Sequence, residues 1–347
     1  MKKTLKITFI VAGIIILTGI ICVLIAFCSS GFSFNKMFLQ DYEIKTVVIK
    51  KSSGITNIEF DNQYFDVEIY ESEDGVLRIE YPEVENVIYD YKIDSDGRTL
   101  RNSISDNRKW YEHVNWRLGY SDNKTKIYLP KQEYKSFKLK CDSSDVSFRC
   151  NIDIGSCEIV TKSGDIHFSN SSADNINLST SSGDIRFTFV EKIEANLQTV
   201  SGDIYIGNVS EAKVLARTTS GDITAETNRF KRFNARTESG DISSKIMSAT
   251  DWIGLNTTSG DINIFNMRCH QIYLESVSGD IEFDKLDNQS INIETTSGDV
   301  EGYLLNPTRF LVETTSGDKR IGGYKEDSGR LCFVKTVSGD VSVEVKE

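Results

Sequence analysis

Aspartate side chains recur in this sequence at a spacing that would place them in one line. An Asp follows a Ser-Gly pair ten times, and successive copies are 19 or 20 residues apart, except for a last interval of 22. Ca²⁺ binds carboxylate oxygens, so six of these residues are candidate ligands for a line of cations: Asp184, Asp203, Asp222, Asp261, Asp280 and Asp299. Each Ca²⁺ needs about six to eight oxygens, however, and one carboxylate per repeat supplies few of them. The alternative is that each Asp accepts a hydrogen bond from a nearby turn amide and faces water.

Catalysis has less support in the residue pattern. An enzyme that acts on polysaccharides would need paired carboxylates, or acids beside Arg or Lys, in a cluster that interrupts the repeat. The acids of this chain are instead spaced uniformly. His113, His167 and His270 are scattered, and no spacing resembles a Ser/His/Asp triad or a set of metal ligands. We therefore predict a protein that is not an enzyme, with no catalytic residues and no cofactor.

Cysteine chemistry is the third possibility. Cys141, Cys157 and Cys332 occupy repeat positions that we expect to point inward, so each is predicted to be a buried thiol. Cys150 could approach Cys141 or Cys157, but spacing alone does not establish a disulfide bond.

The element that must hold the aspartates is the repeat itself. Counted from each glycine, the residues seven and five before it and two after it are mostly apolar, and the residue three before it is Thr in every copy but one. These positions share one parity and therefore one face of a strand. The ten glycines are Gly164, Gly183, Gly202, Gly221, Gly240, Gly260, Gly279, Gly298, Gly317 and Gly339.

One repeat cannot bury its own apolar row, so the copies must stack in parallel. The sequence predicts an all-β, single-stacked parallel β-solenoid over residues 136–347, with an eleventh, degenerate coil at Ser144 and Asp145. Each coil would contain two short strands joined at a corner, with Thr and Ser inward in hydroxyl ladders, Gly at the turn and Asp outward. The extra residues of the last interval are predicted to form a loop at 319–330.

Both ends of such a stack are exposed parallel edges. Residues 41–135 are β-rich and are predicted to form an N-terminal cap or early coils. At the other end, the strand at 341–347 is predicted to be an edge that charge protects, or a point of end-to-end self-association.

Aromatic residues suggest two further binding surfaces. Those in the polar segment 103–123 either pack against the first coil or form a ligand-stacking loop: Trp110, Tyr111 and Trp116. Those on the outer surface of the repeat do not form a sustained row, which argues against a carbohydrate-stacking platform: Tyr205, Trp252, Tyr273 and Tyr303.

The N-terminal segment has the pattern of a membrane anchor. Residues 1–6 carry three lysines and would form a cytoplasmic tip, and Ile7 to Phe27 is a run of 21 residues without a charge. As a helix this run spans about 31 Å, close to the hydrocarbon thickness of a bilayer. It has no A-x-A-like cleavage site, so an uncleaved single-pass anchor is favoured over a cleaved signal peptide. The lysines keep the N-terminus inside, so the linker at 28–40 and the rest of the chain would be extracytoplasmic.

The net charge of −11 argues against nucleic acid and anionic lipid as partners, because both require a basic surface. The Thr-x-Ser-Gly-Asp-Ile repeats, with Lys126-Ile-Tyr-Leu-Pro130 before them, resemble the bacterial "putative adhesin" family of SGD-repeat proteins, a family of unknown function. The resemblance covers about residues 43–347. It implies a β-solenoid on the cell surface and brings no catalytic residues.

Two classes of function fit a solenoid behind a single anchor. The first is a surface binding or adhesin-like scaffold for a protein or a cell-wall or polysaccharide ligand. The second is an envelope structural or stress-sensing module that acts through a membrane-protein partner. A cation-binding solenoid and a polysaccharide-active β-helix are minor alternatives.

Overall fold

The computed structural model describes residues 2–29, 42–50, 52–62, 65–108 and 123–346. The aromatic residues at 110, 111 and 116 and the histidine at 113 therefore lie outside the described residues. Helix α1 (Lys2–Ser29) contains the predicted span 7–27. The exposure of its side chains is described for residues 13–25 and 28. In the described residues, no helix combines the length and the apolar character that crossing a membrane requires. The anchor stays a prediction.

The chain divides into two compact units. Residues 1–45, 81–88 and 105–123 belong to one unit, and residues 46–80, 89–104 and 124–347 form the other, which we call the solenoid unit. The elements before the first repeat are β1 (Ile44–Ile49), the 3-10 turn η1 (Ser52–Gly54), β2 (Asn57–Asn62), β3 (Val67–Glu71), β4 (Leu77–Pro82), β5 (Val87–Ile93), β6 (Thr99–Asp106) and β7 (Thr125–Leu129).

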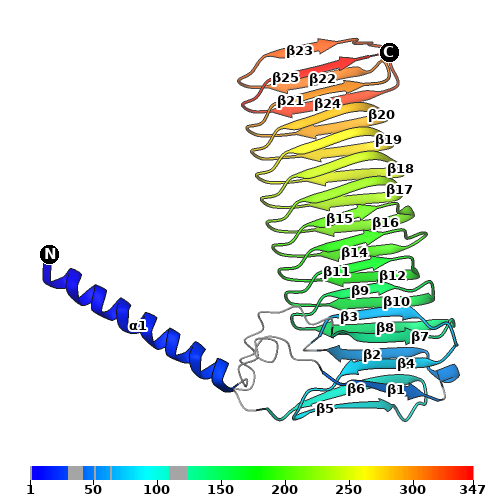
Figure 1. The fold of residues 1–347 in the computed structure, drawn as a ribbon. Helices are drawn as coiled ribbons and strands as arrows, with labels where there is room; N and C mark the ends of the chain where they lie inside the picture. The colour runs from blue at the N-terminus through cyan, green and yellow to red at the C-terminus, as the bar shows by residue number, and fades with distance from the viewer. Residues whose placement is uncertain (1, 30–41, 51, 63–64, 109–122, 347) are drawn as a thin grey trace. The chain divides into compact units, whose positions relative to one another are not determined.

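Each repeat adds one coil to the solenoid unit, with one extended segment before the corner and one after it (Figure 1). The strands of the repeats are β8 (Tyr134–Cys141), β9 (Val146–Arg149), β10 (Asp153–Val160), β11 (Ile166–Ser169), β12 (Ser172–Ser179), β13 (Ile185–Thr188), β14 (Glu194–Gln198), β15 (Ile204–Gly207), β16 (Ser210–Arg217), β17 (Ile223–Arg236), β18 (Ile242–Asn256), β19 (Ile262–Glu275), β20 (Ile281–Glu294), β21 (Val300–Leu304), β22 (Arg309–Thr314), β23 (Lys319–Gly322), β24 (Leu331–Thr336) and β25 (Val341–Val345).

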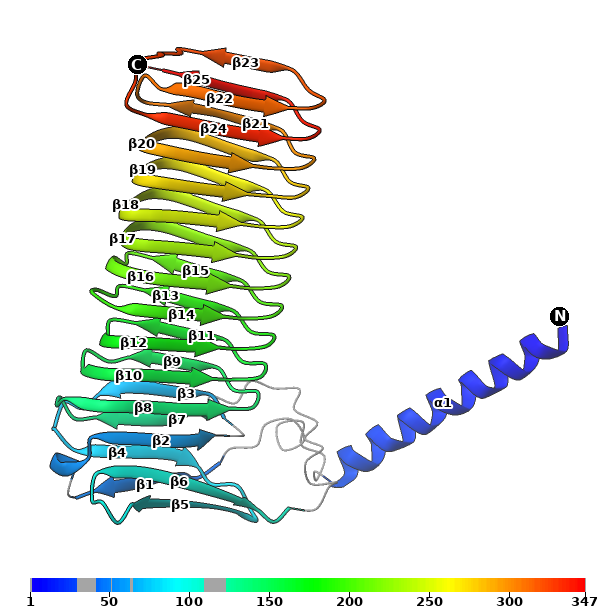
Figure 2. The same ribbon diagram turned by 180° about the vertical axis from the view of Figure 1, so that it is seen from behind.

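Neighbouring coils pair in parallel, so the predicted β-solenoid is confirmed. We call sheet 1 the strands that precede each Ser-Gly-Asp corner: β2, β8, β10, β12, β14, β16, the C-terminal halves of β17 to β20, β24 and β22. Sheet 2 contains the strands that follow the corner. In stack order these are β3, β9, β11, β13, β15, the N-terminal halves of β17 to β20, β21, β25 and β23. Figure 2 shows the stack from behind.

The coils bend from sheet 2 into sheet 1 at a left-handed residue that the repeat pattern did not reveal. It lies six residues after the motif glycine in seven successive coils, with φ between 53° and 56°: Asn170, Phe189, Asn208, Thr227, Ile246, Asn266 and Lys285. Asn tolerates this conformation, whereas a β-branched residue there is strained. The bend lets β17 to β20 continue for 14 or 15 residues across both sheets.

The core lies between the two sheets and is formed by the predicted inward rows. Val146, Ile166, Ile185 and Ile204 form one fully buried row two residues after the corner. Phenylalanines stack in the next row, where the ring centroids of Phe148 and Phe168 are 4.9 Å apart. Because each coil buries its side chains only against its neighbours, stability depends on contacts between adjacent coils.

The stack extends into the segment before the first repeat. Strands β2 and β3 form a coil that pairs in parallel with β8 and β9. Strands β6 and β7 then pair in parallel with the other edges of β2 and β3, although they follow them in sequence. The order of coils in space therefore differs from the order in the chain at this end.

The C-terminal end has the same kind of exchange, and it corrects the prediction that the last strand is an edge. Strand β25 is paired on both sides, with β21 and with β23, and β24 lies between β20 and β22. The last coil of the chain is thus inserted before the coil of Gly317, and β22 and β23 are outermost. The predicted loop at 319–330 is also partly wrong, because Lys319–Gly322 is strand β23 and only the residues after it form the connection.

Residue types explain this exchange. Cys332, Val334, Val341 and Val343 of the inserted coil are all buried, as an internal coil requires. In the outermost coil, Lys319 occupies the position where the other copies carry Ile or Val, and the structure leaves it exposed. A charged residue at this position is acceptable only where no further coil covers it.

Candidate functional site

The corner motif is a structural device built from main-chain hydrogen bonds. The Oγ1 of Thr199 donates to the carbonyl oxygen of Gly183 in the preceding coil at 2.9 Å and accepts from the N–H of Gly202 at 3.2 Å. The predicted row of inward Thr hydroxyls is present, and each Thr bonds to main-chain groups. The motif Ser, such as Ser201, is exposed and does not point inward as predicted.

Glycine is required at the corner because adjacent coils approach closely. A Cβ added to Gly202 would lie 1.9 Å from the carbonyl oxygen of Gly183. In the described residues, positive φ values at glycine occur at Gly75, Gly97 and Gly323 and at none of the motif glycines. The sequence correctly located these residues but explained them by turn conformation, whereas the structure explains them by the space between coils.

The aspartates form a continuous ladder of hydrogen bonds from coil to coil. The main-chain N–H of each Asp donates to the Oδ1 of the Asp in the neighbouring coil, at 2.8 Å for Asp222 and Asp203. In stack order the ladder contains Asp66, Asp145, Asp165, Asp184, Asp203, Asp222, Asp241, Asp261, Asp280, Asp299, Asp340 and Asp318. The bonding of Asp to a turn amide is as predicted, except that the donor belongs to the neighbouring coil.

The candidate cation ligands are these same residues. Except in Asp318, which ends the ladder, one oxygen of each carboxylate accepts from a main-chain amide, which leaves one oxygen per coil for a cation. Across the described ranges, no group of three or more His, Cys, Asp or Glu side chains is placed to hold a metal ion. The six candidate aspartates lie in one row, but the structure does not gather them into a site.

The histidine and cysteine candidates are dispersed as well. His167 lies on β11, where burial, and then the charges of Arg149 and Arg186, lower its pKa, and His270 lies on β19. Cys141, Cys150 and Cys157 are buried and free, so the bridge that spacing left open does not form. Burial raises the pKa of Cys141 to about 12, which suppresses its reactivity.

The surface aromatics divide between the two sheets. On sheet 2, the guanidinium of Arg186 lies 4.6 Å from the ring centroid of Tyr205, and the Nζ of Lys346 lies 3.1 Å from that of Tyr303. On sheet 1, Trp252 and Tyr273 come from adjacent coils and have no cation or ring contact within the described part of the chain. Trp252 is half-buried with its indole against Gly254, and Tyr273 is 45% exposed, so these two rings are the candidates for contact with a ligand.

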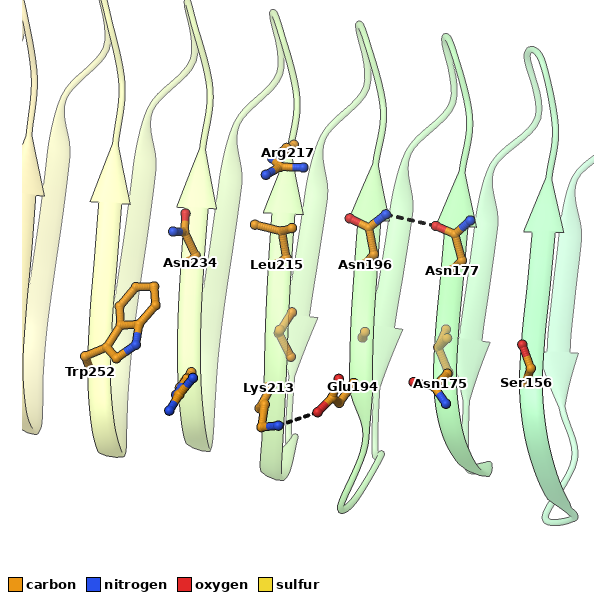
Figure 3. A pocket seen from close by; sticks show the side chains of 14 residues that line it. Ser156, Asn175, Asn177, Glu194, Asn196, Lys213, Leu215, Arg217, Asn234 and Trp252 are labelled. Atoms are coloured by element: carbon orange, nitrogen blue, oxygen red, sulfur yellow. Dashed lines mark hydrogen bonds and ion pairs between the residues drawn. The ribbon is translucent and has the colours of Figure 1, made fainter.

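Sheet 1 carries a groove on its outward face, with a volume of about 570 Å³ (Figure 3). Its floor is a half-buried row that crosses neighbouring strands: Asn177, Asn196, Leu215 and Asn234. Exposed rows flank this floor on both sides. One row contributes Glu194, Lys213 and Arg232 to the lining, and the other contributes Arg217, which is paired in register with Gln198 and Arg236 of the neighbouring coils, just outside the lining. Trp252 closes the floor at one end, where a second hollow continues past it to Tyr273.

Hydrogen bonds fix part of this groove and leave part of it open. The Nδ2 of Asn196 donates to the Oδ1 of Asn177 at 3.0 Å, whereas the Oδ1 of Asn196 has no hydrogen-bond partner, because its neighbour in the next coil is Leu215. Lys213 pairs with Glu194, and the Nε of Arg232 lies 2.9 Å from Oδ2 of Asp251. Arg217 and Arg236 form no ion pair with any described residue.

Comparison with known families identifies the fold. The family model described as Toastrack DUF4097 matches residues 55–247 and 228–347. This chain belongs to the Toastrack DUF4097 family. This membership confirms the resemblance to the SGD-repeat proteins and the β-solenoid fold. The Toastrack family has no established function, so membership assigns no functional site.

Three solved structures are similar to this Toastrack chain. A crystal structure described as a putative lipid binding protein from Parabacteroides distasonis has 14% identity and a TM-score of 0.34, with 88% of this chain and 97% of that one covered. A putative adhesin from Bacteroides fragilis has 15% identity and a TM-score of 0.28, with coverage of 88% and 98%. A putative cell adhesion protein from Clostridium sporogenes has 9% identity and a TM-score of 0.19, with coverage of 88% and 100%. No curated protein matches the chain.

The groove is the part of this Toastrack domain that sequence reasoning missed. Its residues alternate with the inward rows, but their types differ from coil to coil, so no repeat position marks them. Asn does recur six residues before the glycine, at Asn177, Asn196, Asn234 and Asn292, but Asn292 lies outside the groove, so this recurrence alone does not locate it.

Proposed function

We propose that this Toastrack chain is a membrane-anchored, extracytoplasmic and non-catalytic binding scaffold. The observation that carries the proposal is the groove on the outward face of sheet 1. Parallel pairing holds its side chains in register over at least five coils, from Asn177 to Trp252. A surface of fixed register is suited to binding an extended ligand and needs no reacting groups.

The proposed location outside the cytoplasm rests on the N-terminal sequence. The uncharged residues 7–27 lie within α1, and Lys2, Lys3 and Lys6 precede them. Inserted in a bilayer, this helix would leave the solenoid unit outside the cytoplasm. The groove would then face the cell wall or the surroundings of the cell.

Co-sedimentation with isolated bacterial cell walls tests the proposal. The full chain in detergent micelles is mixed with the walls, beside a Trp252→Ala, Arg217→Gln variant and a Tyr205→Ala control that alters the outward face of sheet 2. We expect the wild type and the control to sediment with the walls and the groove variant to stay in solution. Equal sedimentation of all three, or of none, would refute the proposal.

A membrane-protein partner is the competing outcome. If the walls bind nothing and one membrane protein is cross-linked to the chain in native membranes, then the envelope structural or stress-sensing module is favoured. The same groove variant then shows whether the partner contacts the groove, because a partner that does so would no longer be cross-linked to the variant.

A further inference from the structure

The shape of the groove selects a linear ligand. Its floor is half-buried and both of its walls are exposed, so it is a channel that runs across the strands of sheet 1 and not a closed cavity (Figure 3). The channel advances about 4.8 Å with each coil, which is similar to the length of one sugar residue in an extended polysaccharide. Equivalent positions of successive coils could therefore contact successive units of one polymer.

The floor has the side chains that bind sugars. Asn177, Asn196 and Asn234 offer amide donors and acceptors to hydroxyl groups, and each can do both. Trp252 and Tyr273 offer aromatic faces, and Tyr273 is 45% exposed. The floor lies on the face of a sheet whose strands are already paired on both sides, so a peptide could not add to it as a further strand.

The walls select a negatively charged ligand. Arg217 and Arg236 are paired in register on adjacent coils, both are exposed, and neither has an ion-pair partner among the described residues. Two such guanidinium groups side by side repel each other and favour an anion between them. Arg217 lines the groove and Arg236 lies beside it in the next coil, so this edge of the groove carries two unpaired positive charges in a chain whose net charge is −11.

We infer that the groove binds a linear glycan that carries carboxylate or phosphodiester groups. The inference rests on the proposed function and adds the class of ligand. The anionic groups lie over Arg217 and Arg236, and a neutral part of the same polymer stacks on Trp252.

Binding of defined oligomers to the full chain in detergent micelles tests the inference. The probes are hexagalacturonic acid, a phosphodiester-linked hexose oligomer of the same length, neutral chitohexaose and hexaglutamate peptide. We expect at least one acidic glycan to bind about tenfold more tightly than chitohexaose, with a dissociation constant that rises with salt. The two acidic glycans distinguish a uronate ligand from a phosphodiester ligand.

Variants locate the contacts. Arg217→Gln with Arg236→Gln should raise the dissociation constant of the acidic glycan to that of chitohexaose and remove its salt dependence. Trp252→Ala should weaken both glycans, and Tyr205→Ala on sheet 2 should weaken neither. All of these residues are at the surface, so unfolding curves that match the wild type would show that the fold is intact.

Four results would overturn the inference: chitohexaose binds as tightly as the acidic glycans, hexaglutamate matches them, the Arg variant binds unchanged, or no oligomer binds. If cell walls still bind through the groove in those cases, then the proposed function survives and only the ligand class is wrong. If the walls do not bind either, both proposals fail.

Discussion

The indole of Trp252 lies over the main chain of Gly254, where an added Cβ would come within 2.9 Å of the ring carbon Cζ3. The two residues are neighbours on the outward face of one strand of sheet 1. Gly254 therefore allows the indole to lie flat and to close the floor of the groove.

The first prediction concerns this pair. Gly254→Ala should lift the indole, destabilise the chain by about 1 kcal/mol through crowding and abolish binding to cell walls. Gly207→Ala is the matched control, because its Cβ would lie 2.9 Å from Cε1 of Tyr205 on sheet 2. It should destabilise the chain similarly and leave binding unchanged. Denaturant unfolding and co-sedimentation measure both effects, and a loss of binding in both variants would contradict the assignment of the groove.

A second prediction separates the two roles of the aspartate ladder. Asp222→Ala removes the acceptor of the Asp241 N–H and should lower the free energy of unfolding by about 1 kcal/mol. Asp222→Asn keeps a side-chain oxygen and removes one charge from a row of like charges, so it should be at least as stable as the wild type. Denaturant unfolding measures both variants, and a destabilised Asn variant would mean that the charge itself is needed.

A third prediction concerns the left-handed residue at the bend between the sheets, where Ile and Asn can be exchanged at two equivalent positions. Ile246 is 55% exposed and has a φ of 53°, a strained conformation for a β-branched residue. Ile246→Asn should therefore stabilise the chain by about 1 kcal/mol, whereas Asn266→Ile at the equivalent position should destabilise it by a similar amount. Thermal unfolding of both variants measures the difference, and equal effects of one sign would refute the strain argument.

The unpartnered oxygen of Asn196 supplies a fourth prediction. Figure 3 shows this oxygen turned toward Leu215. Leu215→Asn would place a donor beside it and should stabilise the chain by about 1 kcal/mol. In Leu215→Asp the new side chain has nearly the same shape as Asn but no hydrogen-bond donor at neutral pH. This variant should be less stable than the wild type. Equal stabilities of the two variants in denaturant unfolding would contradict the proposed hydrogen bond.

The sequence predicted the solenoid because the inward positions repeat with one parity, and it located ten of the twelve ladder aspartates by their Ser-Gly-Asp motif. An eleventh, Asp145, was recognised from the degenerate copy. Asp66 was missed because Phe65, and not Gly, precedes it. The exchange of the last two coils was missed as well, although Lys319 in an apolar position was its signal. Local patterns show which residues point inward, but they do not determine which coil is stacked on which.

The groove was beyond prediction for a different physical reason. Its floor combines Asn, Leu and Trp from five coils, and nothing in a stack requires outward residues to be alike. Trp252 and Tyr273 were identified as surface aromatics, but the sequence did not show that the indole of Trp252 lies over Gly254, the residue that is paired with Tyr273.

Hydroxyl-radical footprinting of the full chain bound to cell walls tests the central claim most directly. Mass spectrometry would report the oxidation of individual side chains with and without the walls. We predict that the walls protect Leu215, Trp252 and Tyr273 on sheet 1 and leave Tyr205 and Tyr303 on sheet 2 unchanged. Protection confined to sheet 2, or no protection of Trp252 while the walls are bound, would contradict the proposed binding face.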